Sequence, residues 1–103
     1  MTDWQDLIRK ETVAVERVLR NSEVVIRNPA LTSVQAERLV LQVIKGRDSI
    51  SIVIEKMIVA EVDREVILPA IKLRDIWDGL EHAAVARLEI IRKLEAASPE
   101  GSG

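Results

Sequence analysis

The feature that most constrains the fold is a central segment, residues 48–66, whose middle part is rich in aliphatic side chains. Between positions 50 and 62 its apolar residues are Ile50, Ile52, Val53, Ile54, Met57, Ile58, Val59, Ala60 and Val62. If the segment is helical, only Asp48, Ser51, Glu55 and Asp63 form a polar stripe. A helix that is apolar around most of its circumference needs cover on several sides. We therefore expect neighbouring helices on at least two sides of it.

A short strand is the competing interpretation of residues 49–54, because apolar residues alternate there and several are β-branched. The alternation breaks at Lys56 and Met57, and again at Ala60 and Glu61. No second segment shows a strand pattern with which this one could pair. The sequence therefore favours a helix.

Capping signals predict where the first two helices begin and end. Thr2 with Gln5 is typical of a capping box, and the apolar spacing that follows predicts a helix over residues 3–27. This helix should end at Asn28, because the residue before a proline avoids helical backbone angles. Thr32 with Gln35 is a second capping box and predicts a helix over 33–45.

Glycine and proline predict the remaining boundaries. Gly46 is a plausible helix stop, and Asp48 can cap the next helix at once, so we expect a tight hairpin between helices 33–45 and 48–67. Pro69 suits the first turn of a further helix over 69–97. The alternative is that the last two helices are one long helix kinked at Pro69. Together these boundaries predict an all-α four-helix bundle, which we expect oligomerisation to complete.

Length and composition exclude several classes of protein. A chain of 103 residues has room for one domain, predicted over 1–97, with a polar tail at 98–103 that we expect to be disordered. The absence of cysteine excludes disulfides and thiolate sites, and a single histidine excludes sites that need two imidazoles. No cofactor, metal or membrane segment is predicted. The N-terminus shows no secretory signal, so we expect a cytoplasmic protein.

Nucleic acid is not an expected partner, because the net charge is −2 and no residue is Phe or Tyr. The outline of a helix-turn-helix is present around Gly46, but its second helix would present Asp48, Ser51, Glu55 and Asp63 to the groove. Acidic groups there would face phosphates at an energetic cost. A helix-turn-helix DNA-binding regulator is therefore a weaker hypothesis.

Polar residues offer one possible enzymatic or ligand-binding arrangement. Some small helical bundles act through inward-facing charged groups alone, without a nucleophile. The residues that could take such positions are Arg38, Glu55, Glu61, Arg64, Arg87 and His82. His82 is the only histidine of the chain, and Asp78 lies one turn before it. The competing interpretation is that these charges are solvated and that the stem of Arg87 covers the edge of the core.

The excess of apolar surface favours a different function. Four short helices cannot bury every aliphatic residue, and exposed apolar patches usually mark interfaces. The candidate interface residues are Ile50, Val53, Ile54, Met57, Ile58, Val13, Val24, Val85 and Ile90. We therefore predict a non-enzymatic module that associates with itself, most simply as a dimer, or with another helical protein.

Three alternatives stay open at this point. The chain could be a monomer with ordinary scattered surface valines. It could be a small all-α enzyme or ligand-binding bundle that uses inward Arg/Glu pairs. It could also be an engineered assembly component without natural activity, which the lack of Phe, Tyr and Cys and the terminal Gly-Ser-Gly would fit.

Overall fold

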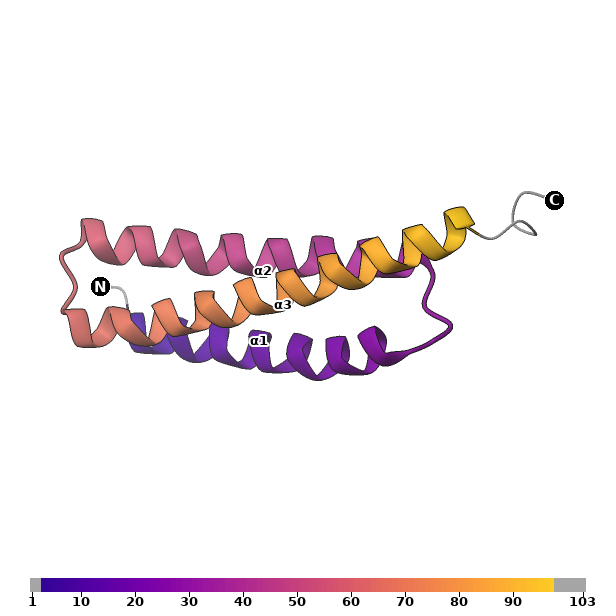
Figure 1. Ribbon diagram of the computed structural model, residues 1–103. Helices are drawn as coiled ribbons and strands as arrows, with labels where there is room; N and C mark the ends of the chain where they lie inside the picture. The colour runs from indigo at the N-terminus through magenta and orange to yellow at the C-terminus, as the bar shows by residue number, and fades with distance from the viewer. Residues whose placement is uncertain (1–2, 98–103) are drawn as a thin grey trace.

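The chain folds into three helices, each antiparallel to the next along the chain, as Figure 1 shows for the computed structural model. The structure describes residues 3–97, and within them α1 spans Trp4–Arg27, α2 spans Ser33–Val59 and α3 spans Arg64–Ala97. The ribbon runs along α1, returns along α2 and runs forward again along α3. No strand occurs among residues 3–97, so the short strand at 49–54 is excluded. The predicted tail at 98–103 lies outside the described residues.

The predicted boundary between the first two helices is confirmed. α1 ends at Arg27, and Asn28 takes an extended conformation with φ −70° and ψ 115°. α2 begins after Thr32, where both hydrogen bonds of the capping box form: the Gln35 amide donates to Thr32 Oγ1, and the Thr32 amide donates to Gln35 Oε1. At the start of α1 the cap is Asp3, whose carboxylate accepts from the Asp6 amide. Thr2, the cap expected from sequence, lies outside the described residues.

Loss of the second capping box is expected to destabilise the fold moderately. Thr32→Ala removes the acceptor for the Gln35 amide, so the free energy of unfolding should fall by about 1 kcal/mol. Chemical denaturation followed by circular dichroism measures this change. Thr32→Ser keeps the hydroxyl and is the matched control, which should leave stability within about 0.5 kcal/mol of the original chain. Equal losses in the two variants would contradict a capping role.

The predicted hairpin at Gly46 is wrong, because α2 continues through this residue as an unbroken helix. The reason lies on α3. A Cβ atom at position 46 would overlap the six-membered ring of Trp77, which is only 2% exposed. Gly46 is therefore needed for the close approach of two helices, not for a turn, and residues 33–59 form one helix.

The predicted break at residues 67–69 is also wrong, because the chain reverses earlier, at residues 60–63. The end of α2 has the hydrogen bonds of a Schellman motif: the Val62 amide donates to the Met57 carbonyl and the Glu61 amide to the Ile58 carbonyl. Glu61 has φ 56°, a left-handed angle usually taken by glycine. No glycine or proline marks this turn, so the usual punctuation is missing from the sequence.

Pro69 lies inside α3, in its second turn. Its missing amide leaves only the carbonyl of Glu65 without its usual helical partner, and both residues are exposed, so water can satisfy that oxygen. The helix therefore continues through Pro69. The alternative of one long helix kinked at Pro69 is wrong as well, because the turn at 60–63 separates α3 from the preceding helix.

The core lies mainly between α2 and α3, and α1 covers it with two buried valines. Its largest fully buried side chains include Trp77 on α3 and Ile50, Met57 and Val43 on α2. The α1 contribution is Val15 and Val18. At the other end of the bundle, a smaller cluster comprises Leu31, Ala36, Leu88 and Ile91. None of the described helices combines the length and apolarity needed to cross a membrane.

The bundle is elongated, which limits how much surface it can bury. Its principal extents are 61 × 21 × 18 Å, and its radius of gyration is 17.1 Å. A compact domain of this length would have a radius of gyration of about 13 Å. The accessible surface is 7290 Å², against about 5800 Å² expected for a globular protein of this mass. Aliphatic residues therefore remain on the surface in large number.

Candidate interaction surface

Three of the predicted interface residues lie in the chain's own core. Ile50 and Met57 have no exposed surface, and Ile54 is 3% exposed. They face α1 and α3 because α2, a single long helix, directs this face inward along the bundle. We predicted that a second chain must cover the segment around them. For these three residues the prediction is wrong, because their own chain buries them.

The other predicted interface residues do not form one continuous surface. Val53 and Val85 are half-buried, and Val53 packs against the core. Val13, Val24, Ile58 and Ile90 are exposed, but they lie on three different helices. On α1, Val13 shares a shallow hollow with Glu16, Arg17, Arg20 and Asn21, so its neighbours are mainly charged.

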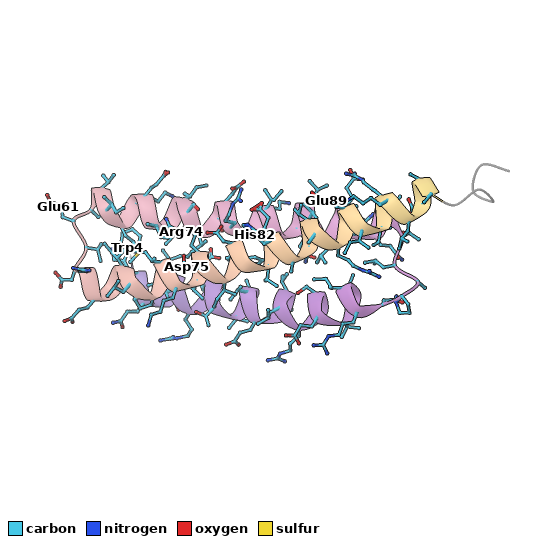
Figure 2. The ribbon with its side chains drawn as sticks, in the orientation of Figure 1. Trp4, Glu61, Arg74, Asp75, His82 and Glu89 are labelled. Carbon is cyan, nitrogen blue, oxygen red and sulfur yellow. The ribbon has the colours of Figure 1, made fainter. Side chains whose placement is uncertain are left out.

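The polar residues considered for an enzyme or ligand site are not brought together. Arg38, Glu55, Glu61 and Arg64 are exposed, and no two of the six candidates form an ion pair within the described part of the chain. In Figure 2, Glu61 lies at the tip of the α2–α3 turn, whereas His82 lies near the middle of α3. The pocket that the catalytic hypothesis requires is not formed by these residues.

His82 is held on the surface by its own helix. Its Nδ1 lies 3.1 Å from the carbonyl oxygen of Asp78, so Nδ1 donates to the backbone and the Asp78 carboxylate does not orient the ring. The hollow beside it, of about 350 Å³, is lined only by α3 residues: Glu81, His82, Val85, Ala86 and Glu89. Among residues 3–97, no three His, Asp or Glu side chains lie close enough to hold a metal ion.

Arg87 and Arg47 serve the packing of the helices. The half-buried Arg87 donates from Nη2 to the carbonyl of Asn28 at 3.4 Å and so joins α3 to the end of α1. Its Nε is buried without a partner, as is Nε1 of Trp77. Arg47 on α2 forms a partly buried ion pair with Glu81 on α3. These contacts join α3 to the end of α1 and to α2.

An exposed apolar face lies on α2, on the side opposite the core. Leu41 is nine residues before Ile50, about two and a half helical turns, and therefore points in the opposite direction. The four aliphatic residues of this face are 51–83% exposed. They are Val34, Leu41, Ile52 and Val59. None of the four was among the interface residues predicted from sequence.

Charged residues lie between these aliphatic ones along the same line. At successive spacings of four and three residues, eight exposed side chains follow one another on α2, and we name this line the α2 seam. It consists of Val34, Arg38, Leu41, Lys45, Asp48, Ile52, Glu55 and Val59. The four–three spacing is that of a helix seam that packs against another helix. The sequence contains this spacing, which could have indicated the seam. The break predicted at Gly46 hides it, because it divides the eight residues between two helices.

Comparisons with protein-family models, curated proteins and solved structures found no significant match for this chain. The function of the chain is therefore inferred from the surface of the bundle itself.

Proposed function

We propose that this chain is a non-enzymatic helical module whose function is association with proteins, in the simplest case with a second copy of itself. The observation that supports this function is the exposed aliphatic surface: eleven large aliphatic side chains among residues 3–97 are at least 41% exposed. Exposed single residues are ordinary on any protein, but on α2 four of them follow one line of a helix.

The energetics favour covering this surface. Burying one large aliphatic side chain stabilises a complex by about 1.5–3 kcal/mol relative to its full exposure. Four such residues from each of two chains can together offset a typical cost of association, which is about 4–15 kcal/mol. The slender bundle cannot fold over its own α2 face, because α1 and α3 already occupy the opposite side.

The mass in solution tests the proposed function. Light scattering coupled to size exclusion should give a mass above the 11.6 kDa of one chain, and the mass should fall towards that value on dilution. A mass of 11.6 kDa that does not change up to about millimolar concentration, where associations worth more than about 4 kcal/mol are populated, would contradict self-association. We would then expect the chain to associate with a different protein and not with itself.

A further inference from the structure

We propose that two copies of this chain pair through their α2 seams in antiparallel orientation, about a two-fold axis that passes next to the peptide between Gly46 and Arg47. This inference rests on the proposed function and adds to it the partner, the surface and the orientation. It follows from the order of the eight seam residues, which is complementary to itself when one copy is reversed.

The apolar residues match one another in the reversed pairing. The midpoint of the seam lies halfway between Val34 and Val59, so each of these residues meets the other on the second copy. The same axis places Leu41 of one copy against Ile52 of the other. Both Leu41 and Ile52 are more than half exposed in the single chain, at 61% and 51%. Every large aliphatic residue of the seam therefore acquires an aliphatic partner.

The charged residues match in the same pairing. In the first half of the seam the charges are basic, Arg38 and Lys45, and in the second half they are acidic, Asp48 and Glu55. Reversal places Arg38 against Glu55 of the second copy, and Lys45 against Asp48. None of Arg38, Lys45 and Glu55 forms an ion pair with another residue in the described part of its own chain. Four opposite-charge contacts thus accompany the four aliphatic ones.

A parallel pairing in the same register would oppose like charges instead. Arg38 would face Arg38, and Lys45 would face Lys45; on the acidic half, Asp48 and Glu55 would each face their own copies. Like charges placed opposite each other across an interface weaken association and select against that orientation. The charge order therefore chooses the antiparallel arrangement.

The bundle leaves this face accessible. In Figure 1, α2 forms the upper edge of the molecule over most of its length, α1 forms the lower edge, and α3 crosses in front of the beginning of α2. All eight seam residues are exposed. The seam extends for about 38 Å, given the rise of about 1.5 Å per helical residue. Two bundles can therefore lie back to back along α2 without rearranging their cores.

Cysteine cross-linking tests the orientation, because the chain contains no cysteine of its own. The double variant Leu41→Cys/Ile52→Cys should form disulfide-linked dimers on mild oxidation. Within one chain the two positions are about 16 Å apart, too far for a disulfide. The single variants Leu41→Cys and Ile52→Cys are the controls: in the antiparallel pair, each cysteine is about 16 Å from its own copy, so neither should cross-link efficiently. Efficient cross-linking of either single variant indicates a parallel pair and overturns the proposal.

Charge reversal supplies a second test with a rescue. Arg38→Glu places two acidic residues against each other at both ends of the dimer, so its Kd should rise by about tenfold or more. The double variant Arg38→Glu/Glu55→Arg reverses both charges and should return the Kd to within about threefold of the original value. Ile90→Glu, at an exposed site on α3, is the control and should leave the Kd unchanged. Circular dichroism establishes that every variant keeps its helical content.

These outcomes separate the two proposals. If the chain self-associates but the double charge reversal gives no rescue, or Ile90→Glu is the variant that dissociates it, the α2 pairing is wrong and the proposed self-association stands. If the original chain is monomeric at every concentration, self-association and the α2 pairing fail together.

Discussion

Ile50→Asp is expected to unfold the chain, whereas Ile52→Asp, two residues away, is expected to leave it folded. Ile50 has no exposed surface and lies in the core with Trp77, so a carboxylate there would lose its hydration. Loss of the apolar side chain costs about 1.5–3 kcal/mol, and burial of an unpaired charge adds several more. The sum approaches the whole stability of a domain of this size, about 5–15 kcal/mol. Ile52 is 51% exposed, so its replacement should change stability by less than about 1 kcal/mol.

Far-UV circular dichroism at 25 °C and at micromolar concentration measures this contrast. We expect Ile50→Asp to lose most of its helical signal and Ile52→Asp to keep it with a cooperative thermal transition. Low concentration matters because Ile52 also belongs to the α2 seam, and a dimer would add its own stability to the original chain. If Ile52→Asp unfolds the monomer, or Ile50→Asp does not, the inward and outward faces of α2 are assigned wrongly.

The second large effect is expected at the two described glycines that lie within helices, which should respond to alanine in opposite directions. Gly46→Ala places a Cβ atom into the ring of the buried Trp77, and overpacking of this kind costs about 1–3 kcal/mol even though alanine favours the helix. At Gly79 an added Cβ meets nothing within 4 Å, so Gly79→Ala should stabilise the fold by about 0.5–1 kcal/mol.

Urea denaturation of the two variants measures both changes, and Gly79→Ala is the matched control for the effect of alanine on helix stability. A second comparison isolates the contact with the ring. In a Trp77→Leu background the six-membered ring is gone, so Gly46→Ala should cost much less than in the original chain. Equal costs in the two backgrounds would show that Gly46 is not required by the approach of Trp77.

The sequence predicted the helical class and several boundaries because their causes are local. Aliphatic residues at three- and four-residue spacings predict helices wherever they occur, and Thr32 with Gln35 forms its capping box with neighbouring backbone alone. The proline after Asn28 acts in the same way, through the backbone of the adjacent residue. Whether the polar candidates face inward and converge depends on how the helices are placed, and the placement leaves most of them exposed and apart.

Both boundaries were misplaced because glycine and proline alone do not decide where a helix ends. A glycine within a helical pattern can end a helix or admit a neighbour, and only the neighbour decides between them; here Trp77 of α3 occupies the space beside Gly46. The true turn at Glu61 has no glycine, and its left-handed backbone is held by the hydrogen bonds that close α2. The break predicted at Gly46 also divided the α2 seam and concealed its four–three spacing.

The amino-acid sequence by itself determined that this chain is helical, where α1 ends and α2 begins, and the order of aliphatic and charged residues along α2. Tertiary structure decided that α2 is one helix, that Ile50 and Met57 face the core, and that Leu41 and Ile52 remain outside. The physical reason is that helix formation and capping involve residues a few positions apart. The choice of a buried face depends instead on which distant side chains fill the space beside it.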